Sequence, residues 1–540
     1  LFLLLLPVTA YLAADSIMPA IDGYRSPLRD QPPQPGPAPL PRLTRRVVFV
    51  LIDGLRADAA FDPQVMPFLA ELRRSGASAE MRSRAPSFSA PAYAVLFTGA
   101  WQDLSDGPPS NQYLDDYRAW TQDHLFAAAK RAGMQTGVAG YYWFEKFIPA
   151  SLRDVFYFTP GEDQAADAEV MRASARWVAD PTFKFVLVHL DQVDYAGHNE
   201  GGGAGPAYAS AAGRVDELLR QVAGHLYLAE DTLLVTSDHG HLDRGGHGGP
   251  EAVVTTQPFV LAGAGVRPGQ YPEIQMVDVA PTVAALLGLP LPASAQGRAQ
   301  RGMLALSPDQ EQALLQAELQ QQQQLAEALR QAGAAFDLPV DPADPVGSLQ
   351  AQMVDALDPG IGWRIAGTVG LLALVGAAWY RRRSPLLFWG FAAALFYLFL
   401  FHQMYAVALG RTYSFSSVKS SGDLILATVL PAVLAYLLAL IGLRYAFQYK
   451  DWVVPPAAAA LELALSVLTL LLLPVLVHAA WNGFTPERFL PEYWTLFFAL
   501  SALLQMIAVG GLGALATAGL ALYPQRPAKS VTSLASSSGR

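Results

Sequence analysis

Most of the side chains that could bind a metal ion are concentrated in three short segments of the chain. In each segment an apolar run leads into aspartate and histidine: VVFVLIDGLR, VLVHLDQVDYAGH and LLVTSDHGHLDRGGHGG. Carboxylate and neutral imidazole are suitable ligands for Zn²⁺, which is favoured, and the same groups also suit Mn²⁺. The candidate ligands in these segments are Asp53, Asp194, His198, Asp238, His239 and His247.

These groups are about the number that two four-coordinate divalent ions require when a serine and a substrate oxygen complete the coordination. Two ions about 4 Å apart stabilise both the attacking and the leaving oxygen of a displacement at phosphorus. Taken singly, an Asp-Gly pair after a strand is usually a turn, and one Asp-x-x-x-His spacing is weakly diagnostic. However, three of the nine histidines, at positions 239, 241 and 247, share one glycine-rich loop. Because such groups are costly to bury without partners, the three segments together predict a two-metal site.

Ser89 is the candidate nucleophile of this site. It lies in the segment RAPSFSAPAYAVLFTG, shortly before Pro91, which suits the first turn of a helix that extends to Thr98. A hydroxyl at a helix N-terminus lies near free N–H groups and the positive end of the dipole, which favours its alkoxide. Metal coordination would activate it further. Ser87 is the competing nucleophile, and the plain alternative is that Ser89 only caps the helix.

The elements that must position these side chains alternate between strand-like and helix-like segments over residues 45–305. The runs Val47–Ile52, Phe185–Leu190 and Thr232–Thr236 are short and apolar, which is typical of strands buried on both faces of a parallel sheet. Helical patterns at Gln122–Ala132 and Ala207–Ala223 lie between strand-like runs. The sequence therefore predicts an α/β sandwich with a mostly parallel central sheet. Ligands collect at the carboxyl ends of strands in such sheets, so the three segments can meet there.

A second part of the chain has the composition of a membrane protein. Of the 540 residues, 52% are hydrophobic and only 15% are charged, which is typical of a chain partly embedded in lipid. Five apolar segments approach or exceed the roughly 20 residues that a spanning helix requires: 361–380, 385–409, 424–443, 453–479 and 494–522. We therefore expect a C-terminal bundle of five transmembrane helices over residues 361–523, in a multi-pass protein of the plasma membrane.

Four further stretches complete the expected organisation. Residues 1–16 look like the truncated remnant of an N-terminal signal or anchor helix, and the proline-rich residues 31–44 look like a semi-rigid linker. Residues 306–358 are expected to form a solvated helical linker that contains five consecutive glutamines. Residues 524–540 are expected to be a cytoplasmic tail.

Basic residues predict the orientation of the helices. Arg381–Arg383 lie between the first and second apolar segments, Arg444 and Lys450 between the third and fourth, and Arg526 and Lys529 after the fifth. Cytoplasmic placement of these sites satisfies the positive-inside rule and puts the catalytic domain outside the cytoplasm. The chain has no N-x-S/T sequon, which favours a bacterial envelope over the lumen of the endoplasmic reticulum.

The composition also excludes several kinds of site and partner. The chain has no cysteine, so disulfides, thiolate zinc sites and a cysteine nucleophile are ruled out. A net charge of −9 without a long basic tract argues against a nucleic acid polymer as a partner. Glu462 and His402 lie within apolar segments, where they either line a groove for a lipid headgroup or make hydrogen bonds between helices.

The three ligand segments and the serine segment resemble those of the alkaline phosphatase superfamily, in its phosphodiesterase branch. The pattern is similar to that of the glycosylphosphatidylinositol ethanolamine phosphate transferases and of the nucleotide pyrophosphatase/phosphodiesterases. The resemblance covers residues 45 to about 300 and includes the closing segment MVDVAPTVAALLGLPLP. SDHGHLDRGGHGG is its most specific piece, because the transferases also carry a histidine shortly after DHG. The resemblance implies an alkaline-phosphatase-like fold, with one metal held by Asp53, Ser89, Asp238 and His239, and a second held by Asp194, His198 and His247.

The resemblance further implies that Ser89 attacks a phosphodiester, forms a phosphoserine-type intermediate and passes the group to an alcohol or to water. The favoured substrate is a phosphodiester or lipid headgroup, handled by a membrane-anchored phosphoethanolamine-type transferase acting on lipid or glycan. The alternatives are an extracytoplasmic phosphodiesterase or nucleotide pyrophosphatase, and a non-enzymatic metal-binding ectodomain. Ala92 stands where the nucleotide enzymes are expected to carry a phosphate-binding asparagine, and Tyr93 replaces the arginine of the sulfatase motif.

Overall fold

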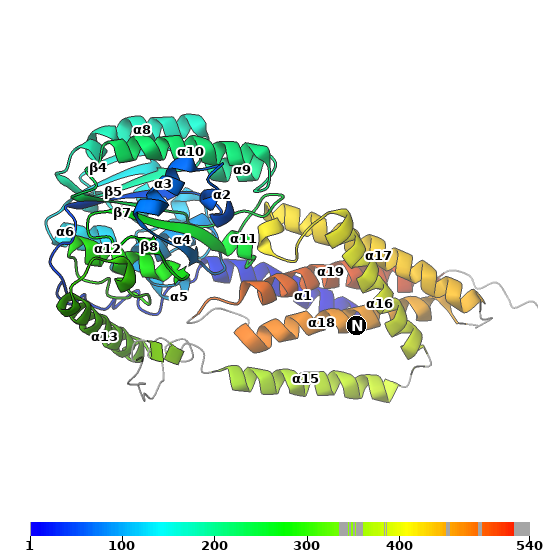
Figure 1. The fold of residues 1–540 in the computed structure, drawn as a ribbon. Coiled ribbons are helices and arrows are strands. Elements are labelled where there is room, and N and C mark those ends of the chain that lie inside the picture. Colours follow the sequence, from blue (N-terminus) through cyan, green and yellow to red (C-terminus); the bar gives the residue numbers. More distant parts are fainter. Residues whose placement is uncertain are drawn as a thin grey trace, which may run out of the picture.

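The computed structural model contains an α/β domain joined to a bundle of long helices (Figure 1). It describes residues 2–333, 344, 347–348, 351–352, 360–382, 384, 386–449, 454–483 and 489–522. The expected tail at 524–540, the sites at Arg526 and Lys529, and most of residues 334–359 lie outside the described residues.

A nine-stranded sheet forms the centre of the α/β domain, in the order β4-β3-β5-β1-β6-β7-β2-β8, with β9 also paired to β2. The strands from β4 to β6 in this order are parallel to their neighbours, whereas β7 runs antiparallel to both β6 and β2. The mostly parallel sheet predicted from the sequence is therefore confirmed. The strands are β1 (Arg46–Ile52), β2 (Ala77–Arg82), β3 (Gln135–Tyr141), β4 (Val155–Thr159), β5 (Phe183–Leu190), β6 (Asp231–Thr236), β7 (Thr256–Gly263), β8 (Gly269–Gln270) and β9 (Ile274–Gln275).

The three strands that precede the candidate ligands are neighbours at the centre of the sheet. β1 is buried along its whole length, which accounts for its unbroken apolar sequence. Leu51 of β1 pairs with His189 of β5 on one side and with Thr236 of β6 on the other. The carboxyl ends of β5, β1 and β6 therefore lie side by side, and the chemistry-bearing segments that follow them begin at one edge of the sheet.

Helices cover both faces of the sheet (Figure 1). One apolar cluster packs β1 and β5 against α4 (Ser89–Thr98), α6 (Leu125–Arg131) and α12 (Val279–Leu287). The opposite cluster involves α2 (Ala57–Phe61), α3 (Pro67–Ser75), α8 (Gln164–Ala179), α9 (Gln192–Asn199) and α10 (Pro206–Gly224). Further short helices in this domain are α5 (Gln102–Ser105), α7 (Phe144–Phe147), α11 (Ala252–Thr255) and single turns at Leu114–Asp116, Ala150–Leu152, Met276–Asp278 and Arg301–Met303.

Five helices of the second part are long and apolar enough to cross a membrane, so the chain has the organisation of a multi-pass membrane protein. α18 and α19 pack against each other, and α1 (Phe2–Asp22) packs along α19 as a further helix of the bundle (Figure 1). The five are α15 (Ile361–Arg382), α16 (Leu387–His402, continued by a wider turn at Gln403–Ala408), α17 (Ser421–Tyr449), α18 (Pro456–Asn482) and α19 (Tyr493–Leu522); a single turn at Phe415–Ser417 lies between α16 and α17.

The two parts meet through the segments that follow α16 and α18. The backbone N–H of Leu490 donates to Asp103 Oδ1 at 2.7 Å, and the Tyr493 hydroxyl donates to the carbonyl of Pro109 at 3.0 Å. The segment after α1 is held as well, by Arg25 Nη2 at 2.6 Å from Asp106 Oδ2. α15, which ends at Arg382, and α17, which ends at Tyr449, both end away from the α/β domain (Figure 1), as the expected orientation requires; which side is cytoplasmic stays a prediction.

Two expectations about the flanking segments differ from the structure. α1 extends to Asp22, past the expected end at residue 16. The polar helix α13 (Pro308–Gln331) is buried along one face and is not a purely solvated linker. Gln321 Nε2 donates to the carbonyl of Ala293 at 2.8 Å, and Glu318 forms a 2.6 Å ion pair with Arg301. The glutamine run therefore satisfies backbone carbonyls of the α/β domain, a role that composition does not reveal.

Glu462 makes the kind of contact that the second hypothesis for Glu462 and His402 predicts, a polar contact between helices. Its carboxylate forms a 2.8 Å ion pair with Arg382 and accepts a hydrogen bond from Ser384 at 3.3 Å. His402 similarly pairs with the Tyr413 hydroxyl at 3.0 Å. Glu462 therefore connects α18 with the end of α15, whereas His402 connects α16 with the segment that follows it.

Candidate two-metal site

Asp53 and Asp238 begin the site because each follows the end of a central strand. The backbone N–H of Asp53 still donates to Leu190 of β5, at 2.8 Å, so the aspartate is fixed as an extension of the sheet. Gly54 then turns the chain with φ +69°, and a Cβ there would lie 2.9 Å from Asp194. Only glycine fits this turn without strain. Through this turn the Gly54 N–H donates a hydrogen bond to Asp238 Oδ1, at 3.1 Å.

Three side chains converge on the Nε2 atom of His239. Its Nε2 lies 3.1 Å from Ser89 Oγ and 3.4 Å from both Asp53 Oδ1 and Asp238 Oδ2. Those two carboxylate oxygens are buried without a hydrogen-bond partner, an arrangement that costs free energy unless a cation lies between them. His239 Nδ1 lies 3.2 Å from the carbonyl of Gly240, so we assign the ring proton there, which leaves the Nε2 lone pair directed at the group. This donor set fits a divalent metal.

A second group forms around Asp194 on α9. Asp194 Oδ2 lies 3.5 Å from His198 Nε2, and His198 Nε2 lies only 2.9 Å from His247 Nε2. His247 Nδ1 is 3.1 Å from the carbonyl of Ser87, so His247, like His239, is assigned its proton on Nδ1 and presents a lone pair from Nε2. Two imidazole nitrogens and a carboxylate facing one another in this way also fit a divalent metal. The rings of His239 and His247 stack with centroids 3.7 Å apart, so the two groups adjoin.

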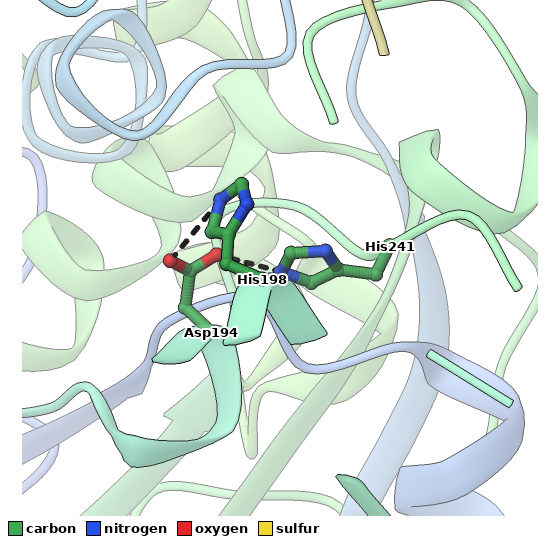
Figure 2. A group of neighbouring side chains, drawn as sticks. All are labelled: Asp194, His198 and His241. Atoms are coloured by element: carbon green, nitrogen blue, oxygen red, sulfur yellow. Dashed lines mark hydrogen bonds and ion pairs between the residues drawn. The ribbon is translucent and has the colours of Figure 1, made fainter. Parts of the chain in front are cut away.

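His241 belongs to the second group but presents the other tautomer. Figure 2 shows the Asp194 carboxylate linked by dashed lines to the rings of both His198 and His241. The backbone N–H of Gly246 donates to His241 Nδ1 at 3.1 Å, so that nitrogen accepts and Nε2 carries the proton. Nε2 then donates to Asp194 Oδ1 at 2.7 Å. Although its position would allow a metal contact, His241 has its lone pair committed to the backbone and acts by orienting Asp194.

The charges in the site suit cation binding. Burial raises the pKa of Asp194, but His198, His241 and His247 outweigh that effect and hold the pKa well below its ordinary value. Burial, reinforced by His239, holds the pKa of His247 well below the ordinary value for imidazole, so the ring is neutral. Burial and the nearby carboxylate of Asp53 raise the pKa of Asp238 well above its usual range. Asp238 beside Asp53 therefore ionises readily only when a cation neutralises the pair.

The two candidate serines are clearly distinguished. Ser87 Oγ donates to the carbonyl of Gly249 at 2.7 Å and accepts from the N–H of Gly248 at 3.1 Å, so its hydroxyl is committed to the loop after His247. Ser89 is the first residue of α4, is 6% exposed and lines the cavity described below. Phe88, not Ser89, occupies the N-cap position. Ser89 therefore does not serve as the cap of this helix.

Four residues of the site were missed by the sequence patterns. Tyr93 and His189 lie behind Asp53: the Tyr93 hydroxyl donates to Asp53 Oδ2, and His189 Nε2 lies 3.0 Å from the same oxygen. Asp191 lies close to Asp53 and Asp194. Asn111 accepts from the N–H of Ala90 at 3.0 Å through Oδ1, beside the nucleophile. Asn111 supplies an asparagine from a distant segment, which inspection of Ala92 could not predict. His189, near the end of β5, and Asp191, directly after it, could have been found from the position of that strand.

A cavity of about 800 Å³ opens onto the candidate ligands. Asp53, Ser89, Asp194, His198 and His247 line it from the α/β domain. Its other wall comes from the α16–α17 segment, including Arg411, Phe415 and Ser416, and from Tyr493 at the start of α19. The candidate site is therefore bounded by the membrane part of the chain.

Comparison with known proteins gives consistent matches for the α/β domain. A family model described as Type I phosphodiesterase / nucleotide pyrophosphatase matches residues 47–257. The human GPI ethanolamine phosphate transferase 2 catalytic subunit is 26% identical over 276 residues, which cover 48% of this chain and 28% of that protein. The transferase 2 of Saccharomyces cerevisiae is 24% identical over 309 residues, covering 49% of this chain and 36% of its own length. The chain thus spans about a third of the curated relatives it matches.

Solved structures also align with about half of the chain. Human ectonucleotide pyrophosphatase/phosphodiesterase 5 covers 48% of this chain and 100% of its own, at 13% identity and a TM-score of 0.41. The alkaline phosphatase PafA covers 49% of this chain and 100% of its own, at 10% identity and a TM-score of 0.38.

Proposed function

We propose, from the premise that residues 47–257 belong to the phosphodiesterase branch of the alkaline phosphatase superfamily, that this chain is a membrane-bound, metal-dependent phosphoryl-transfer enzyme. Its favoured activity is that of a phosphoethanolamine-type transferase, which acts on a phosphodiester and passes the group to a lipid or glycan. The names of the relatives support this choice.

The observation that carries the proposal is the position of the Ser89 hydroxyl. Ser89 Oγ lies at the start of α4 and 3.1 Å from His239 Nε2, at the edge of a cavity large enough for a lipid headgroup. A purely structural metal site has no need of a free hydroxyl among its ligands. This position therefore favours an enzyme over a non-enzymatic ectodomain.

Seven side chains would hold two divalent ions in this proposal. Asp53, Ser89, Asp238 and His239 would hold one, while Asp194, His198 and His247 would hold the other; Zn²⁺ is favoured by the imidazole and carboxylate set. When bound, such ions supply charge stabilisation for the attacking and leaving oxygens of the displacement. His189 and Tyr93 fix Asp53 from behind, and His241 fixes Asp194.

The reaction would proceed through the serine in two displacements. Ser89 Oγ forms a bond to phosphorus as the bond to the first alkoxide breaks; the serine proton passes to that alkoxide, which leaves as an alcohol, and a phosphodiester remains on the serine. The hydroxyl of an acceptor then attacks the same phosphorus, the Ser89–phosphorus bond breaks, and the proton of the acceptor returns to the serine oxygen. The amide of Asn111, beside the N-terminus of α4, is placed to hydrogen-bond a phosphate oxygen in both steps.

The wall formed by the α16–α17 segment supports a substrate in the membrane. A soluble nucleotide has no need of a site closed by membrane helices, whereas a lipid headgroup enters such a site from the bilayer surface. In this proposal the catalytic domain lies outside the cytoplasm, as the basic segments predict. The absence of an N-x-S/T sequon favours a bacterial plasma membrane.

The first test is an assay of the purified full chain with bis(p-nitrophenyl) phosphate, before and after chelation. We expect chelation to abolish hydrolysis, added Zn²⁺ or Mn²⁺ to restore it, and Ser89→Ala to remove it while two metals per chain are retained. Ser210→Ala, an exposed serine on α10, is the matched control. Full activity of Ser89→Ala would contradict the mechanism.

The second test identifies the donor and acceptor. Mass spectrometry of lipids and glycans from cells that lack the chain should show the loss of one phosphoethanolamine-bearing species. An unchanged profile, together with hydrolysis of the synthetic diester, would favour a phosphodiesterase over a transferase.

A further inference from the structure

One wall of the cavity carries a buried carboxylate that no part of the proposed reaction uses. Asp191 follows β5 directly, lines the cavity and is only 7% exposed. Its backbone N–H donates to Asp167, but its carboxylate makes no hydrogen bond or ion pair with any residue that the structure describes. A carboxylate buried in this way is costly unless a cation or N–H donors reach it.

The neighbouring wall is aromatic and acidic. Tyr141, at the end of β3, and Trp143, two residues later, both line the cavity, and their rings lie 5.0 Å apart at 65°. The Tyr141 hydroxyl donates to Glu162 Oε1 at 2.6 Å, which turns a second carboxylate toward the same wall. Because β3 lies beside β5 in the sheet, Asp191 and Tyr141 approach from adjacent strand ends.

Asp191 is surplus to the two proposed metal groups. It lies near Asp53 and Asp194, but each group already has its own carboxylate and imidazole donors without it. The basic residues that line the cavity, Arg244, Arg411 and Lys419, come from the loop after β6 and from the α16–α17 segment. The wall that carries Asp191, Tyr141 and Glu162 contributes acidic and aromatic groups but no basic side chain to the lining, so a positively charged part of the substrate would fit on this side.

We propose that Asp191, with Glu162 and the rings of Tyr141 and Trp143, binds the ammonium group of a zwitterionic phosphodiester. The carboxyl oxygens accept hydrogen bonds from the ammonium N–H groups, and the ring faces add a cation–π contribution. Because the Asp191 carboxylate lacks hydrogen-bond donors, a primary ammonium with three N–H groups fits better than a trimethylammonium group. This inference rests on the proposed function and adds to it the feature of the donor that the site selects.

The test uses two chromogenic diesters that differ only in charge: p-nitrophenyl 2-aminoethyl phosphate and p-nitrophenyl propyl phosphate. With the full-length, metal-loaded chain, we expect kcat/KM to be about tenfold higher for the amine, mostly through KM. Asp191→Asn should bring the ratio close to one, mainly by lowering kcat/KM for the amine-bearing diester. Asp115→Asn, an exposed aspartate outside the cavity lining, is the matched control and should keep the wild-type ratio.

Metal content separates the subsite from a ligand role. Asp191→Asn should still bind two metals per chain; a fall to one metal, or an unchanged preference for the amine, would overturn the subsite. If the wild-type chain cleaves neither diester, the proposed function fails. Binding of 2-aminoethyl phosphate against propyl phosphate to the metal-loaded protein then decides the subsite independently: equal affinities overturn it, and amine preference lost in Asp191→Asn supports it.

Discussion

At the scale of single residues, the tautomers of the pocket histidines divide them by role. His239 and His247 donate from Nδ1 to backbone carbonyls and present a lone pair from Nε2, whereas His241 accepts at Nδ1 and donates from Nε2. The hydrogen bond from the Gly246 N–H therefore distinguishes His241, which orients Asp194, from the candidate ligands His239 and His247. The sequence shows three histidines in a glycine-rich loop but contains no sign of this difference.

The division predicts different outcomes for two substitutions. His247→Ala should lower the metal content to one ion per chain, because it removes a ligand. His241→Ala should keep two ions but weaken the binding of one by about 10- to 100-fold, since Asp194 loses the group that orients it. Titration with a competing metal indicator measures both effects, with the exposed His225→Ala as control. Equal losses in the two variants would contradict the assignment.

At the scale of elements, α9 begins at the end of β5 and depends on a carboxylate from another helix. The N-cap residue of α9, Asp191, makes no cap hydrogen bond of its own. Instead Asp167 of α8 accepts from the N–H of Asp191 at 2.8 Å and from Gln192 N and Nε2 at 3.3 and 2.8 Å. This contact fixes the start of the helix that carries Asp194 and His198.

The same contact makes stability depend on pH. Burial, only partly offset by these hydrogen bonds, raises the pKa of Asp167 from 3.8 to about 6. Between these values the folded chain holds a proton that the unfolded chain has released. The contribution of Asp167 is therefore full below pH 3.8 and is lost as pH rises through 6, by up to about 3 kcal/mol.

Thermal unfolding of wild type and Asp167→Asn between pH 4 and 8 tests this dependence. The asparagine does not titrate, so the stability of wild type relative to the variant should fall as pH rises from 4 to 6 and stay constant above 7. Parallel curves for the two proteins across the whole range would show that Asp167 keeps an ordinary pKa in the folded chain.

Elements differ in how well the sequence predicts them. The strands at 47–52, 185–190 and 232–236 are buried on both faces, so their unbroken apolar runs identified them, and their carboxyl ends placed six candidate ligands. β2, with the sequence ASAEMR, pairs near the sheet edge and lacks such a run, so its antiparallel pairing with β7 was not foreseen. Asn111 reaches the site from a segment without regular structure, where no periodicity predicts position.

At the scale of the whole molecule, the membrane part supports the loop that carries His247. Ser416, between α16 and α17, accepts from the N–H of Gly249 at 2.8 Å and donates to Glu251 Oε2 at 2.7 Å. A Cβ on Gly246 would lie 2.0 Å from the carbonyl of Ser416, so the two segments are in direct contact. Hydropathy located the helices, but nothing in the sequence indicated which segment between them touches the site.

The contact between Ser416 and the loop that carries His247 predicts that a substitution in the membrane part of the chain changes the metal affinity of the site. Ser416→Ala removes two hydrogen bonds, one of them to a charged group, so we expect metal affinity at the His247 group to fall by about tenfold. Glu251→Gln should have a smaller effect because the amide oxygen still accepts from Ser416. Indicator titration measures both, with Ser210→Ala as control. Unchanged affinity in Ser416→Ala would show that the loop holds its shape alone.

The wall contributed by the α16–α17 segment also has a consequence for synthesis. The ribosome synthesises all the candidate ligand residues, from Asp53 to His247, well before it reaches Ser416. The nascent chain consequently emerges with its acidic and imidazole groups made but with one side of the pocket missing. Because Tyr493, at the start of α19, also lines the cavity, the wall is complete only when the last of the five apolar segments is being made, and activity should not begin before then.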